Sequence, residues 1–150
     1  MSSSLILLLI GVFKIASVQG YVTYTYDERN GKQYHISNEH EPFNLAKMNG
    51  RCKEIGGYLV EIEDYGEYMF VQRVINFVRG RGPFFTGLTD EQHEGRFLNY
   101  NDKTPAKYLR WRWFQPDNWY GEDCVEIGYR GSFNDIGCEK WGRYICEVPK

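Results

Sequence analysis

The sequence predicts an α+β domain, in which helices and strands follow one another without a regular βαβ repeat. The expected elements run strand, helix, strand, helix, then a long irregular segment and three short strands. Four cysteines follow an apolar N-terminal segment, a pattern typical of small secreted domains held by disulfides. The irregular segment carries many side-chain oxygens, so we expect the functional site there.

The first residues predict a secretory signal peptide over 1–20. An apolar run covers 5–13, and Val18 and Gly20 stand at the −3 and −1 positions of a cleavage site after Gly20. The run is too short, and too soon interrupted by Lys14, to cross a bilayer, so no membrane insertion is expected. The alternative is a buried N-terminal helix. Residues 21–150 then form one domain.

The first half of this domain predicts a hairpin and a helix. Residues 21–37 alternate and are rich in β-formers, with a tight-turn signal at Asn30-Gly31. Residues 41–57 have helical spacing, with Pro42 suited to the first turn and Gly56-Gly57 to the end. An Asn49-Gly50 pair inside this helix weakens the expectation.

A short strand over 58–64 leads into the strongest predicted helix, 64–80. Asp64 can cap it, and Glu67 stands three residues on, as in a capping box. Gly80 would end the helix. The expected apolar face comprises Phe70, Val71, Val74, Ile75 and Val78.

The second half predicts short strands around the irregular segment. A buried strand is expected over 84–88, and three more over 124–129, 132–138 and 143–148. Residues 89–123 show little periodicity. Segments of this length inside a small domain are usually functional or disordered. The aromatic content argues against disorder.

The charge balance excludes a nucleic-acid binder. The chain has 18 Lys and Arg against 20 Asp and Glu, with a net charge of −2. Arg110 and Arg112 flank Trp111, but two arginines do not make a phosphate footprint. The cysteines predict two disulfides in one of three pairings, and the absence of a C-x-x-C motif argues against zinc. They are Cys52, Cys124, Cys138 and Cys146.

The stretch "QPDNWYGEDC", residues 115–124, concentrates side-chain oxygens beside Trp119. Ca²⁺ prefers six to eight oxygens from carboxylates, amides and carbonyls held by irregular loops. The alternative is a solvated polar turn, since acidic loops are common. The candidate oxygens belong to Asp90, Glu94, Gln115, Asp117, Asn118, Glu122, Asp123, Asn134 and Asp135.

In this order, several short motifs resemble those of a C-type lectin domain across essentially all of 21–150. The motifs are "GGYLVEI", "FTGLTDEQHEG", "QPDN", "EDCVEI", "FNDIGC" and "RYICEV". The resemblance implies two helices flanking small antiparallel sheets, with a long loop region that binds Ca²⁺. It also implies the pairings Cys52–Cys146 and Cys124–Cys138. The family's Trp-Ile-Gly-Leu and Trp-Asn-Asp are "FTGL" and "FND" here, which we interpret as core replacements.

The resemblance also implies where a sugar would bind. In the family, a sugar-binding Ca²⁺ lies beside a proline with a cis peptide bond, here Gln115–Pro116. The implied ligands of this ion are Gln115, Asp117, Glu122, Asn134 and Asp135. Asp90, Glu94, Asn118 and Asp123, with Glu122 shared, match an auxiliary Ca²⁺ that would brace the loop.

The order Gln-Pro-Asp is similar to that of galactose-type members, whereas Glu-Pro-Asn accompanies mannose-type sugars. Galactose presents an apolar face that an aromatic ring can cover, which gives Trp119 a stacking role. The alternative for Trp119 is a plug that packs the loop onto the core. Galactose-type relatives often have a longer Gly-rich insert that holds this tryptophan. Here only 118–121 separate Asp117 from Glu122. The expected sugar-contacting residues are Gln115, Asp117, Trp119, Glu122 and Asn134.

We therefore expect a secreted, non-enzymatic lectin that captures terminal galactose or N-acetylgalactosamine through Ca²⁺. His35, His40 and His93 are scattered and form no catalytic motif. Expected partners are glycans of microbial or cell surfaces, in innate recognition or agglutination. Because monovalent sugar binding is weak, we expect a non-covalent homo-oligomer. The alternative is a lectin-like protein that binds a protein, a mineral or a mannose-type glycan.

Overall fold

A computed structural model describes residues 16–18, 21–25, 31–78, 82–128 and 131–149. Most of the predicted signal peptide lies outside these residues, as do Asn30 of the expected turn and Gly80, the expected helix end. Strand β1 (Ala16–Val18) falls inside the predicted signal segment and pairs antiparallel with β2 (Tyr21–Thr25). The cleavage after Gly20 stays a prediction.

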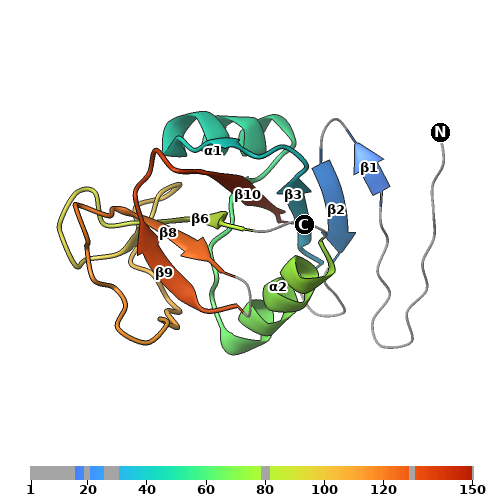
Figure 1. The fold of residues 1–150 in the computed structure, drawn as a ribbon. Coiled ribbons are helices and arrows are strands. Elements are labelled where there is room, and N and C mark those ends of the chain that lie inside the picture. The colour runs from blue at the N-terminus through green and yellow to red at the C-terminus, as the bar shows by residue number, and fades with distance from the viewer. Residues whose placement is uncertain (1–15, 19–20, 26–30, 79–81, 129–130, 150) are drawn as a thin grey trace.

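A twisted sheet forms the centre of the molecule, with one helix on each side (Figure 1). The expected hairpin is confirmed, because β2 pairs antiparallel with β3 (Gln33–Ser37). The strand order continues β3, β10 (Trp141–Val148), β6 (Phe84–Thr89), β8 (Cys124–Ile127) and β9 (Phe133–Ile136). Strands β6 and β10 pair in parallel. The short strands β4 (Glu41–Pro42) and β5 (Tyr58–Leu59) pair with β10, and β7 (Leu98–Asn99) pairs with β6.

Helix α1 (Leu45–Glu54) starts later than the sequence predicted. Pro42 lies in β4 rather than in the first turn, and Asn44 caps the helix by accepting a bond from Lys47 N at 2.9 Å. The Asn49-Gly50 pair stays inside the helix, because the buried Asn49 side chain accepts a 3.0 Å bond from Leu59 N. Gly56, with a φ of 87°, follows the end of the helix as expected.

Helix α2 (Tyr65–Phe77) begins at the expected cap. Asp64 accepts a 2.8 Å bond from Glu67 N. The reciprocal half of the capping box is absent, because the Glu67 carboxylate instead accepts bonds from Glu63 N and from the side chains of Lys32 and Tyr34. The predicted strand over 58–64 is shorter than expected and is limited to β5, although Val60, Glu61 and Ile62 stay buried.

The core has two parts, one on each side of the sheet. The α2 side packs residues such as Val71, Val74 and Phe133, and the α1 side packs Met48 and Phe85. Phe85 and Phe133 are fully buried, so "FTGL" and "FND" do supply core aromatics. Both expected disulfides form: Cys52–Cys146 joins α1 to β10, and Cys124–Cys138 joins the start of β8 to the turn after β9.

Residues 90–123 fold out from the sheet at the end opposite the C-terminus, to the left in Figure 1. Apart from β7 this segment is irregular, as the sequence predicted. Within the described part of the chain, no helix is long and apolar enough to span a membrane.

Candidate functional site

The segment that carries the candidate site is fastened to the edge of the sheet. Arg112 N donates to Phe133 O at 2.8 Å, and Phe133 N donates to Arg110 O at 2.9 Å. Gln115 N then donates back to Arg112 O at 3.0 Å. The peptide bond between Gln115 and Pro116 is cis, as the family resemblance implied. The loop that follows therefore starts from a fixed point on β9.

Three residues in this loop hold left-handed backbone conformations. The φ angles are 65° at Phe114, 51° at Asn118 and 57° at Tyr120. Such conformations cost a bulky side chain about 1–3 kcal/mol each and persist only where surrounding contacts enforce them. Strain of this kind concentrates at binding and catalytic sites.

The buried carboxylate of Asp135 holds the turn at Asn118, one of these three residues. Its Oδ1 accepts a 3.1 Å bond from Asp117 N, and its Oδ2 accepts a 2.6 Å bond from Asn118 N. Asp135 is only 1% exposed and sits on β9, so the turn is tied to the core. Within the turn, Asn118 Oδ1 accepts from Glu122 N at 2.8 Å, and Asp117 Oδ1 accepts from Trp119 N at 3.2 Å.

Three of the five expected ligands of the sugar-binding ion converge here. Carboxylate oxygens of Asp117, Glu122 and Asp135 all lie within 4.8 Å of one another. Burial and the neighbouring carboxylates of Asp135 and Asp117 raise the pKa of Glu122 to about 7. Like charges packed this closely repel one another, and a divalent cation between them would remove that repulsion.

Gln115 adds an amide oxygen to the group. Its Nε2 donates to Asp117 Oδ2 at 3.1 Å. Its Oε1 is buried and accepts no hydrogen bond from the described residues. A buried acceptor without a hydrogen-bond partner costs free energy. This oxygen is therefore suited to coordinate a cation.

Asn134, the fifth expected ligand, is oriented by a residue that the sequence analysis did not identify. Its Nδ2 donates to Glu126 Oε1 at 3.0 Å across the β8–β9 pair, and this bond sets the orientation of the side-chain amide. Glu126 is buried, and burial raises its pKa despite the opposing effects of the Asn134 hydrogen bond and the Arg112 charge. The only signal was an acid in the otherwise apolar "CVEI" strand.

The expected auxiliary ligands lie around the start of the long loop. Asp90 is buried, its Oδ2 accepts a 2.8 Å bond from Gly95 N, and its Oδ1 has no hydrogen-bond partner among the described residues. Burial, and secondarily the charge of Asp123, raise the pKa of Asp90. Asp123 is linked to the end of β6, because its carbonyl oxygen accepts a hydrogen bond from Thr89 Oγ1 at 2.7 Å. Among the described acids, Asp90, Glu94 and Asp123 do not converge as closely as the first group.

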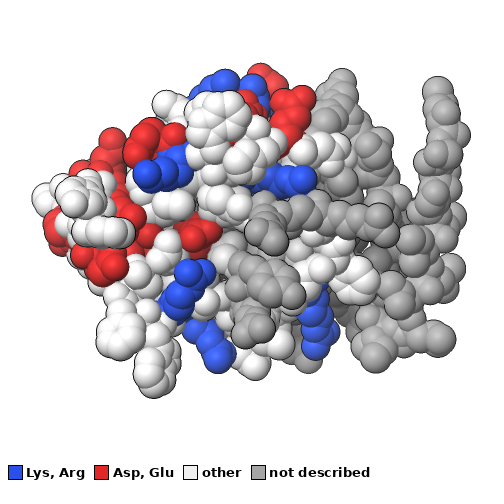
Figure 2. Space-filling view, viewed as in Figure 1, with Lys and Arg blue, Asp and Glu red and all other residues white. Residues whose placement is uncertain are grey.

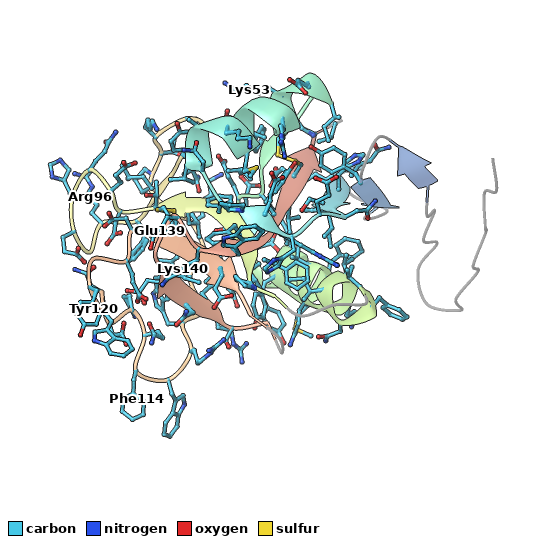
Figure 3. All side chains as sticks on the ribbon, turned by 45° about the horizontal axis from the view of Figure 1, so that its top comes forward. Lys53, Arg96, Phe114, Tyr120, Glu139 and Lys140 are labelled. Carbon is cyan, nitrogen blue, oxygen red and sulfur yellow. A yellow bond between two sulfur atoms is a disulfide. The ribbon has the colours of Figure 1, made fainter. Side chains whose placement is uncertain are left out.

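Aromatic side chains project around the carboxylates. Trp119 is 68% exposed and its ring lies 5.3 Å from that of Tyr120, so the alternative in which Trp119 plugs the core is wrong. Phe114 and Tyr120 point away from the body of the domain (Figure 3). Acidic side chains gather at this loop end, to the left in Figure 2. Exposed rings therefore rim the cluster of Gln115, Asp117, Glu122 and Asp135, which is named here the cation pocket after the ligand that its oxygens could hold.

Comparison with known proteins assigns the family. The sequence profile described as "Lectin C-type domain" matches residues 41–148, which is most of the chain. The chain belongs to the C-type lectin domain family. This family consists of binding domains rather than enzymes.

Individual C-type lectins agree with this assignment. The hepatic lectin of Gallus gallus is 30% identical over 122 residues, covering 79% of this chain and 56% of that protein. The chain thus spans about half the length of this curated relative. The carbohydrate-recognition domain of the mouse scavenger receptor C-type lectin superimposes with a TM-score of 0.72 at 29% identity, covering 87% of this chain and 94% of that one. The trimeric Kupffer cell C-type lectin receptor superimposes with a TM-score of 0.67 at 26% identity, covering 83% and 82%.

Proposed function

We propose that the protein captures glycans through a Ca²⁺ ion held by Gln115, Asp117, Glu122, Asn134 and Asp135. The observation that carries this proposal is the convergence of three carboxylates within 4.8 Å beside the loop that also holds the unpartnered Oε1 of Gln115. Carboxylate and amide oxygens on irregular loops are the donor set that Ca²⁺ prefers. The family membership of the chain also supports this proposal.

The residues divide into positioning groups and sugar-contacting groups. When bound, Ca²⁺ would supply open coordination positions for two neighbouring hydroxyls of a sugar. The amides of Gln115 and Asn134 can donate hydrogen bonds to those hydroxyls, and the carboxylates of Asp117 and Glu122 can accept from them. Asp135 holds the turn in shape, because both of its oxygens bind backbone N–H groups.

We further propose a preference for terminal galactose or N-acetylgalactosamine. The order Gln115, Pro116, Asp117 places an amide before the proline and an acid after it. Trp119 stands two residues beyond Asp117 and is largely exposed. Its ring can therefore cover the apolar face of a galactose unit, with a gain from burial and dispersion.

A second Ca²⁺ at Asp90, Glu94, Asn118 and Asp123, with Glu122 shared, would brace the loop. The unpartnered buried Oδ1 of Asp90 supports this part of the proposal. This second ion would support the loop and would not contact the sugar.

In its wider setting, the protein would be secreted and would act on microbial or cell surfaces in recognition or agglutination. Single sugar sites bind weakly, so such a role needs several linked sites. A trimeric lectin among the similar structures supports a non-covalent homo-oligomer.

The test is retention of the purified protein on immobilised galactose, with Ca²⁺ or with a chelator. We expect retention only with Ca²⁺, and elution by galactose or N-acetylgalactosamine but not by mannose. Elution by mannose alone would keep the ion and contradict the sugar preference. Retention unchanged in excess chelator would contradict the Ca²⁺ mechanism, and no retention at all would favour a protein or mineral ligand.

A further inference from the structure

We propose that a second site beside the cation pocket binds the acidic group of a sulfated or uronic-acid-containing glycan. This inference rests on the proposed function for its glycan context. The site is a hollow of about 670 Å³ between the start of α2 and residues 110–113. It is named here the arginine hollow, and its walls include Tyr65, Tyr68, Arg110, Arg112, Trp113 and Ser132.

The backbone presents both arginines to the arginine hollow together. Residues 110–112 run extended beside β9, bonded on either side of Trp111 through Arg110 O and Arg112 N to Phe133. In an extended chain, residues two apart point to the same side. Arg110 and Arg112 therefore share one side, while Trp111 packs against Phe97 and Phe133 in the core.

The charge of the arginine hollow is not balanced from within. No described acidic residue lines it, and neither arginine makes an ion pair with a described carboxylate. Arg112 does feel the charge of the buried Glu126, whereas Arg110 lies over the ring of Tyr68, 5.4 Å from its centroid. Arg110 also makes a side-chain hydrogen bond with Tyr108. The Tyr68 ring and the Tyr108 hydroxyl hold the Arg110 guanidinium in place, and a guanidinium has further N–H donors for a ligand.

The chemistry of the walls selects an acidic sugar among anionic ligands. Guanidinium groups bind sulfate and carboxylate oxygens through paired N–H donors. Trp113, which is 85% exposed, and Tyr65, which is 56% exposed, offer ring faces on which a sugar ring can stack. Trp113 also lies two residues before Gln115, so a glycan held at the cation pocket can extend into the arginine hollow.

The experiment compares three galactose-terminated disaccharides, one neutral, one sulfated and one with a glucuronate carboxylate. Binding of each is measured by titration calorimetry with Ca²⁺ and with chelator. We expect the acidic disaccharides to bind about tenfold tighter than the neutral one, which is the scale of one or two charge-assisted hydrogen bonds. The variant Arg110→Gln should abolish this advantage and leave the affinity for the neutral disaccharide unchanged.

Lys53→Gln is the matched control. It also removes one positive charge, but from the exposed end of α1 on the opposite side of the sheet (Figures 1 and 3). The acidic advantage should survive in this variant and should fall as salt is raised. Equal loss in Lys53→Gln and Arg110→Gln would mean that net charge alone attracts the ligand, and would overturn the proposal.

The outcomes separate this proposal from the proposed function. Failure of the neutral disaccharide to bind with Ca²⁺ contradicts the lectin function, and Arg110-dependent binding of the acidic disaccharides in chelator would still support the arginine hollow. Equal affinity for acidic and neutral disaccharides overturns the arginine hollow alone. Arg110-dependent binding to anionic phospholipid vesicles, without any response to acidic disaccharides, would likewise overturn it.

Discussion

Nε2 of Gln115 donates a hydrogen bond to Oδ2 of Asp117, 3.1 Å away, so the two side chains that flank Pro116 are tied together. This bond decides which atom of the Gln115 amide is left over. With the nitrogen engaged, Oε1 lies buried without a partner among the described residues. The pair thus presents one amide oxygen and one carboxylate to a cation. Toward a sugar, the Gln115 amide can donate a hydrogen bond and the Asp117 carboxylate can accept one.

The double substitution Gln115→Glu with Asp117→Asn should change the sugar preference and keep the ion. The amide at position 117 can then donate to the carboxylate at position 115, so the tie survives with its direction reversed and the net charge is unchanged. We expect Ca²⁺ affinity within about threefold of the wild type and a preference moved toward mannose by about tenfold or more. Competition of mannose and galactose for one immobilised glycan measures the shift.

The single variant Asp117→Asn is the control for this exchange. It removes a carboxylate from the cluster without replacing it, so Ca²⁺ affinity should fall by about tenfold or more. If the double variant kept its galactose preference while still binding Ca²⁺, Trp119 or the scaffold would set specificity and not the order of amide and acid.

Asp135→Asn should loosen the loop as well as weaken the cation pocket. The carboxylate accepts from two backbone N–H groups, those of Asp117 and Asn118, and an amide can accept from only one of them without placing two donors face to face. We expect a loss of about 1–3 kcal/mol in the free energy of unfolding in chelator, together with weaker Ca²⁺ binding. Urea denaturation and Ca²⁺ titration measure the two effects.

Asp102→Asn is the matched control for that loss. Asp102 also accepts a backbone bond, from Thr104 N at 2.9 Å, but it is exposed and lies outside the carboxylate cluster. Its substitution should leave Ca²⁺ affinity unchanged. A Ca²⁺ affinity of Asp135→Asn equal to that of the wild type would show that the cation lies elsewhere.

The sequence could predict much of this fold because its local signals agree with one another. Asp64 caps α2, the hairpin of β2 and β3 forms, and the cysteine pairing implied by the family resemblance holds. The errors arose where tertiary contacts overrode local preference. Pro42 lies in a strand that pairs with β10. The Glu67 carboxylate accepts a hydrogen bond from Lys32 instead of completing a capping box.

The candidate site was predictable in its acids but not in their support. The sequence motifs identify the residues that supply oxygens. Glu126 acts through its cross-strand hydrogen bond with Asn134, which depends on the register of β8 and β9. The arginine hollow depends on how residues 110–112 lie against β9, which no local pattern in the sequence reveals. Long-range packing of this kind is visible only in three dimensions.

Lys32 holds a buried group of acids together, so Lys32→Met should destabilise the domain strongly. Its Nζ lies 3.0 Å from Glu67 Oε1 and 3.3 Å from Glu147 Oε1, and both glutamates are almost fully buried. Removing one partner leaves buried charges uncompensated, which costs about 3–5 kcal/mol. The midpoint of thermal unfolding, measured in chelator, should fall accordingly.

Lys107→Met makes the comparison sharp. Lys107 Nζ lies 2.6 Å from Glu63 Oε1, closer than any carboxylate contact of Lys32, but the Lys107 side chain is 61% exposed. An exposed pair contributes about 1 kcal/mol or less. Similar losses from the two lysine substitutions would mean that burial does not govern these ion pairs.

Glu61 should make the domain less stable as pH rises. Burial, and then the charges of Asp102 and Glu147, raise the pKa of Glu61 from 4.5 to about 8, and its Oε1 has no hydrogen-bond partner among the described residues. The folded state therefore keeps this proton at pH values where the unfolded state has lost it. The stabilisation is fully present below about pH 4.5 and is lost as pH rises through about 8, by at most about 1.4 kcal/mol per pH unit. Glu147, whose pKa burial raises to about 6, adds a change of the same sign.

The measurement is urea denaturation in chelator across this pH range, for the wild type and for Glu61→Gln. The variant cannot ionise at position 61, so its free energy of unfolding should depend less steeply on pH and should exceed that of the wild type near pH 8. Glu39→Gln, a substitution at an exposed glutamate, should leave the wild-type slope unchanged. A Glu61→Gln slope as steep as that of the wild type would show that the pH dependence comes from other acids, such as the carboxylates of the cation pocket.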